Sequence, residues 1–66
     1  MSKTLEELGY EKREYDNCIT FEKELDIIYF FTQERMIKGT TFVESKTFTM
    51  QELKAIYKYC EDLGWI

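Results

Sequence analysis

The 66-residue sequence contains no histidine and no proline, and it has only two cysteines and three glycines. Without histidine the chain lacks the commonest general base and the commonest catalytic metal ligand. The two cysteines also have no imidazole that could activate them as nucleophiles. The glycines Gly9, Gly39 and Gly64 stand apart from one another, so no glycine-rich loop can hold phosphate groups. These absences predict a protein that is not an enzyme and binds no cofactor or metal.

Long apolar segments are missing as well. The longest uninterrupted apolar run covers residues 27–31, far short of the ~20 residues that a membrane-spanning helix needs. The N-terminal residues also lack the apolar core of a signal peptide. We therefore expect a cytoplasmic protein without a membrane partner, in which Cys18 and Cys60 stay reduced as small apolar side chains.

Acidic residues outnumber basic ones by 13 to 9, which gives a net charge of −4. The adjacent bases Lys12 and Arg13 are flanked by Glu11 and Glu14, and no basic cluster forms elsewhere. Binding to a nucleic acid backbone normally requires a basic face. The composition predicts no direct nucleic acid binding. An acidic protein that imitates DNA is an alternative, although its acids are spread along the whole chain.

The amount of apolar and aromatic sequence indicates a folded chain. Apolar residues make up 44% and aromatic residues 17% of the sequence, and each buried aromatic side chain removes roughly 150–250 Å² from water. Disordered chains have far fewer such residues. We expect residues 1–66 to form one domain.

The C-terminal part has the clearest secondary-structure signal. Thr49 and Glu52 have the spacing of a helix capping box, and Gly64 is suited to end a helix, with Trp65 packing back on its last turn. Between them, apolar residues recur at helical spacing: Met50, Leu53, Ile56 or Tyr57, Cys60 and Leu63. This pattern predicts a long helix over about 50–63, with Glu52 off its apolar stripe.

The same signals occur in shorter form at the N-terminus. Thr4 and Glu7 repeat the capping-box spacing, and Gly9 follows soon after. The similar stretches EELGY and EDLGW then correspond to two helix ends, each followed by an aromatic residue. This pattern predicts a short N-terminal helix.

The middle of the chain has the patterns of β-strands. Residues 18–22 alternate, residues 26–32 are β-branched and aromatic, and residues 36–43 form a further strand in which Gly39 suggests a bulge or bend. Residues 10–15 are a weaker edge strand. Sequential strands with short connections indicate an antiparallel meander. The expected fold is α+β: a short N-terminal helix, three or four antiparallel strands, and a long C-terminal helix on one sheet face.

The segment 27–31 is apolar on both faces of its strand. Ile27, Tyr29 and Phe31 point to one side, and Ile28 and Phe30 point to the other. A single helix covers only one face of a sheet. The second face is covered either by Leu5 and Leu8 of the N-terminal helix or by a partner, of which the simplest is another copy of the chain.

The two ends of the chain resemble a known group of proteins. The opening LEELGYEK and the closing TMQELKAIYKYCEDLGWI are similar to the ends of small uncharacterised proteins from phages and prophages of low-GC Gram-positive bacteria. The resemblance does not extend to residues 14–45. It implies an accessory phage-type protein in a bacterial host cell, with no catalytic residues to transfer.

Three functions from different classes fit these observations. The first is a protein-binding module, which could modulate a host factor or a defence system, with Ile27, Tyr29 and Phe31 as candidate contact residues. For each of these side chains, an ordinary place in the core is the alternative. The second function is the acidic DNA mimic, and the third is a small enzyme or a small protein that sequesters a ligand.

Overall fold

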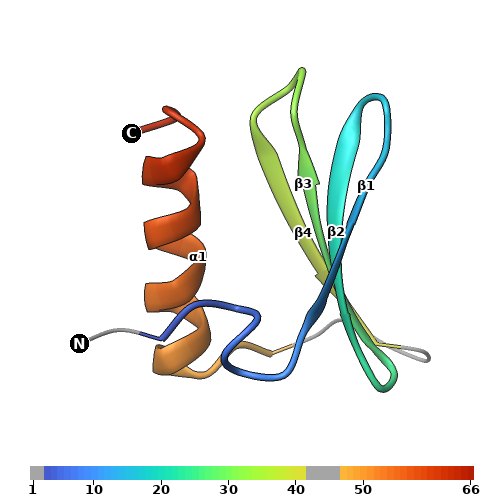
Figure 1. Ribbon diagram of the computed structural model, residues 1–66, viewed down its shortest axis with the longest axis vertical. Coiled ribbons are helices and arrows are strands. Elements are labelled where there is room, and N and C mark those ends of the chain that lie inside the picture. Colours follow the sequence, from blue (N-terminus) through green and yellow to red (C-terminus); the bar gives the residue numbers. More distant parts are fainter. Residues whose placement is uncertain (1–2, 42–46) are drawn as a thin grey trace.

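The computed structural model describes residues 3–41 and 47–66. In these two ranges, four strands form one antiparallel sheet in the order β1-β2-β3-β4, and one helix follows them (Figure 1). The elements are β1 (Glu11–Glu14), β2 (Cys18–Lys23), β3 (Asp26–Phe31), β4 (Met36–Thr40) and α1 (Met50–Asp62). The predicted α+β class and the meander are confirmed, with four strands. Within the described ranges, no helix has both the length and the apolar character needed to cross a bilayer.

Tight turns set the register of the sheet. Lys23 pairs with Asp26 around a two-residue turn, in which Glu24 has a left-handed φ of 52°. Arg35, with a φ of 56°, ends the turn between β3 and β4, where Phe31 pairs with Met36. Because side chains alternate along a strand, this register fixes which residues share a face.

The face that packs against α1 carries the core. Phe21, Ile28 and Phe30 are 0% exposed on this face. Tyr59 of α1 contacts Phe21 and Phe30 edge to face, with ring centroids 5.1 and 5.0 Å apart. Such edge-to-face pairs add about 0.5–1.5 kcal/mol beyond the area they bury. The interlocking rings fix α1 on this side of the sheet.

Both predicted ends of α1 are confirmed. The Thr49 hydroxyl accepts from Glu52 N at 3.1 Å, and the Glu52 carboxylate accepts from Thr49 N at 2.8 Å. At the other end Gly64 has a φ of 77°, and Trp65 N donates to Cys60 O at 2.9 Å. This is the hydrogen-bond pattern that satisfies the last carbonyls of a helix.

The predicted apolar stripe of α1 is confirmed for Ile56, Cys60 and Leu63 and wrong for Met50 and Leu53. The residues buried in α1 are Glu52, Ala55, Ile56 and Cys60, whereas Met50, Leu53 and Tyr57 are 68%, 44% and 60% exposed. Glu52 turns inward because its second carboxylate oxygen accepts a hydrogen bond from the Tyr10 hydroxyl. The buried side of α1 therefore includes this hydrogen-bonded carboxylate, and predicted core residues lie at the surface.

The predicted N-terminal helix is not seen; residues 5–9 form a turn. The capping hydrogen bonds are present, since Thr4 N donates to Glu7 Oε1 at 2.8 Å and Glu7 N donates to Thr4 Oγ1 at 3.1 Å. Gly9, with a φ of 102°, then redirects the chain before a second turn forms. One turn is too short to repay the cost of helix nucleation.

The predicted strand over 36–43 ends earlier, and Val43 lies outside the described residues. Of the two features suggested for Gly39, a bulge or a bend, the bulge is absent, because β3 and β4 pair without interruption from Ile27–Thr40 to Phe31–Met36. Gly39 instead leaves room for the Phe48 ring. A Cβ atom at this position would meet Phe48 Cζ and lie 2.9 Å from Phe48 Cε2.

Gly39→Ala is therefore expected to lower the free energy of unfolding by about 1–3 kcal/mol, the usual cost of overpacking a core. Urea unfolding followed by circular dichroism measures this loss. In a Phe48→Leu background the same substitution should cost less, because the obstructing ring is gone. An equal loss in both backgrounds would contradict the steric explanation.

Tyr10→Phe removes the hydroxyl that donates to the buried Glu52 carboxylate. We expect the variant to lose about 1.5–3 kcal/mol of stability, as is typical when a hydrogen bond to a charged group is lost. Tyr15→Phe is the matched control, because Tyr15 is 55% exposed. Similar unfolding midpoints for the two variants would show that the Tyr10–Glu52 bond contributes nothing.

Candidate functional site

One face of the sheet is not covered by any described element; we call it the open face. α1 lies along the opposite side of the sheet (Figure 1). The strand register arranges the open face in three rows, and neighbours within each row are paired across adjacent strands. The rows are Cys18–Phe31–Met36, Arg13–Thr20–Tyr29–Lys38 and Glu11–Glu22–Ile27–Thr40.

All three predicted contact residues lie together on the open face. Ile27, Tyr29 and Phe31 alternate along β3 and are half-buried. The Tyr29 and Phe31 rings are stacked, with an interplanar angle of 1° and centroids 5.8 Å apart. The centre of this face is therefore a preformed aromatic surface.

One alternative was that Leu5 and Leu8 cover the second face of the sheet. The N-terminal segment does not cover the open face. Leu5 is 2% exposed and belongs to the same core cluster as Phe21 and Ala55, and Leu8 packs against that cluster. Both leucines lie on the α1 side of the sheet. The N-terminal turn therefore packs against the core on the α1 side. It leaves the open-face side chains of β3 half-buried.

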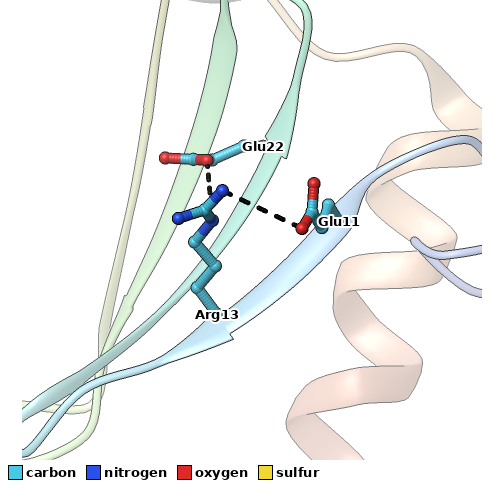
Figure 2. Close-up of polar contacts among 3 residues, drawn as sticks. All are labelled: Glu11, Arg13 and Glu22. Carbon is cyan, nitrogen blue, oxygen red and sulfur yellow. Dashed lines mark ion pairs between the residues drawn. The ribbon is translucent and has the colours of Figure 1, made fainter.

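Charged side chains border the aromatic centre on the β1 side. Figure 2 shows Arg13 between Glu22 and Glu11, with Arg13 Nε 3.2 Å from Glu22 Oε2 and Arg13 Nη2 3.9 Å from Glu11 Oε1. Exposed ion pairs like these contribute only about 0–1 kcal/mol to stability. Lys38 on β4 borders the other side. An apolar centre with a polar rim is the usual anatomy of a protein interface.

Thr20 is a feature of the open face that sequence reasoning missed. Its residue is 4% exposed, and its Oγ1 has no hydrogen-bond partner among the described residues. A buried hydroxyl without a partner costs about 1–3 kcal/mol. Nothing in the local sequence marks Thr20, because its burial depends on the neighbouring strands.

Titratable groups outside the open face have structural causes for their shifts. Burial raises the pKa of the Cys60 thiol, which keeps this side chain protonated. Hydrogen bonds raise the pKa of Lys12, mainly the one to the Glu14 carboxylate and to a lesser extent the one to Tyr59.

Cys60 is buried as expected, whereas Cys18 is only half-buried on the open face. In residues 3–41 and 47–66, no group of three or more acidic, cysteine or histidine side chains could hold a metal ion.

The chain was compared with protein-family models, with curated proteins and with solved structures, and nothing matches it. The functional argument therefore depends on the chain's own residues and on the geometry of the open face.

Thr20→Val should raise the free energy of unfolding by about 1 kcal/mol, because it replaces an unsatisfied buried hydroxyl with a methyl group of similar size. Thr40→Val is the matched control on the same face, since Thr40 Oγ1 donates to Thr41 O at 2.9 Å. Urea unfolding should show a gain for Thr20→Val and none for Thr40→Val. Equal effects would mean that the orphaned hydroxyl has no energetic consequence.

Proposed function

We propose that this chain is a small non-enzymatic protein-binding module that contacts its partner through the open face. The observation that carries the proposal is the stacked pair Tyr29 and Phe31 on a sheet face that no described element covers. Tyrosine and other aromatic side chains supply much of the binding energy in protein interfaces. The resemblance of the chain ends to phage and prophage proteins favours a partner in a bacterial host cell, such as a host factor or a defence protein.

The charges on the open face favour a protein partner over the DNA-mimic alternative. This face carries Glu11 and Glu22 but also Arg13 and Lys38, so its charges sum to −2 + 2 = 0. A surface that imitates DNA needs a dense series of negative charges. The half-buried apolar centre also differs from a polar, phosphate-like surface.

Phe31→Glu tests the proposal, because it places a charge at the aromatic centre. A truncated or charged interface anchor typically costs at least about 2 kcal/mol, roughly a thirtyfold loss of affinity. Immobilised wild-type protein would be exposed to a bacterial lysate, and the retained proteins identified by mass spectrometry. We expect proteins that bind the wild type to be lost with Phe31→Glu.

Leu25→Lys is the control for that experiment, because Leu25 is 63% exposed in the turn between β2 and β3. It should retain the same proteins as the wild type. Circular dichroism must show that all three chains are folded. If Phe31→Glu is folded and retains the wild-type set, the open face is not the binding surface.

A further inference from the structure

The two edges of the sheet differ in the side chains they present. β1 consists of four exposed charged residues, Glu11–Glu14. Charged side chains at an edge discourage the pairing of another strand. β4 carries a single charge, Lys38, and exposes Met36 and Ile37 by 60% and 40%. No described strand pairs with its outer side, so strand addition is favoured at β4.

A groove of about 380 Å³ adjoins β4 on the α1 side of the sheet. Its lining includes Ile37 of β4, Leu53 and Tyr57 of α1, and Trp65 and Ile66 after the helix. Ile66 is 65% exposed, and Leu53 and Tyr57 are one helical turn apart on the surface. The burial of Glu52 leaves these two side chains outside the core. An apolar groove and an unpaired strand edge therefore lie next to each other.

We propose that a second copy of this chain occupies this edge and groove. The β4 strands of the two copies pair antiparallel across a twofold axis perpendicular to the sheet, with Ile37 opposite Ile37 of the second copy. This register places Met36 opposite Lys38, whose aliphatic stem packs on the thioether. Moving the twofold axis by one residue along β4 places Lys38 opposite Lys38, and directly opposed like charges are destabilising.

Charge repulsion between two copies is weaker at this edge than the net charge of the whole chain suggests. The whole chain carries −4, so two copies repel each other on most approaches. Residues 33–41 contain Glu34, Arg35 and Lys38, which sum to −1 + 2 = +1. The excess negative charge of the chain therefore lies outside the β4 edge, where two copies would come together.

The proposed symmetry accounts for the groove as well. A twofold axis perpendicular to the sheet keeps the two α1 helices on the same side of an eight-stranded sheet. Leu53 and Tyr57 of each copy then face the second copy across the paired strands and are removed from water. The open faces remain uncovered, so the inference is independent of the proposed function.

Light scattering at micromolar concentrations tests the self-association. We expect a mass near twice the 8.0 kDa of one chain. The variant Leu53→Lys/Tyr57→Lys should weaken the dimer at least about thirtyfold and scatter as a monomer. Its matched control, Tyr15→Lys/Leu25→Lys, makes the same charge change at two side chains that are 55% and 63% exposed elsewhere, and should remain a dimer.

Three outcomes would overturn the proposal. A monomeric wild type would leave the groove to a partner of a different sequence. A folded Leu53→Lys/Tyr57→Lys variant with the wild-type mass would exclude the groove from the interface. If Phe31→Glu were monomeric while the groove variant stayed dimeric, the copies would associate through their open faces instead.

Disulfide trapping tests the register, in a chain whose natural thiols are removed by Cys18→Ala and Cys60→Ala. Directly opposed strand residues have Cβ atoms about 4.5–5.5 Å apart, close enough for a disulfide to form after a small adjustment. Ile37→Cys should form a covalent dimer on mild oxidation, and an equal mixture of Met36→Cys and Thr40→Cys chains, which keep Lys38, should form much less. Preferential crosslinking of that mixture would overturn the proposed register, because Met36 lies opposite Thr40 only when Lys38 lies opposite Lys38.

Discussion

The structure depends on one constraint: within the described ranges, one thirteen-residue helix covers one face of a four-stranded sheet, and the N-terminal turn, Phe48 and Trp65 complete that side. The chain concentrates its largest side chains on that side, where Phe21 and Phe30 interlock with Tyr59. A chain of this length buries only about 60% of the surface of its unfolded form. Apolar residues in excess of that core must stay partly exposed. The half-buried row on β3 and the exposed pair on α1 are both consequences of this limit.

Glu52 connects the helix to the rest of the molecule. Its carboxylate accepts from the backbone of Thr49, which caps the helix, and from the hydroxyl of Tyr10, which follows the N-terminal turn. The acidic side chain also lies in the first turn of α1, where the helix dipole favours negative charge. The same group therefore links the start of the helix to the N-terminal segment. Leu53 and Tyr57 lie outside the core side of α1 and line the apolar groove beside β4.

The sequence predicts the local features of the fold well because they depend on neighbouring residues. The capping box at Thr49, the glycine stop at Gly64 and the alternation along β2 and β3 require only a few adjacent positions. The sequence could also predict that β3 is apolar on both faces. Which face α1 covers depends on contacts between distant segments, such as Tyr10 with Glu52. The periodicity of a local sequence carries no information about such contacts. For the same reason the buried Thr20 hydroxyl and the space that Gly39 leaves for Phe48 could not be predicted.

The open face and the β4 edge, the two proposed binding surfaces, would impose different geometric conditions on a partner. Strand pairing at β4 extends the sheet in its own plane and satisfies backbone groups, so it selects an extended segment. The open face offers side chains alone, and its two stacked rings suit a partner that contributes its own apolar surface. Pairing through β4 would place two open faces side by side with the same orientation. A partner with twofold symmetry could then bind both open faces at once. Binding at the first face would raise the effective concentration of the partner at the second, so the overall affinity would exceed that of one face alone.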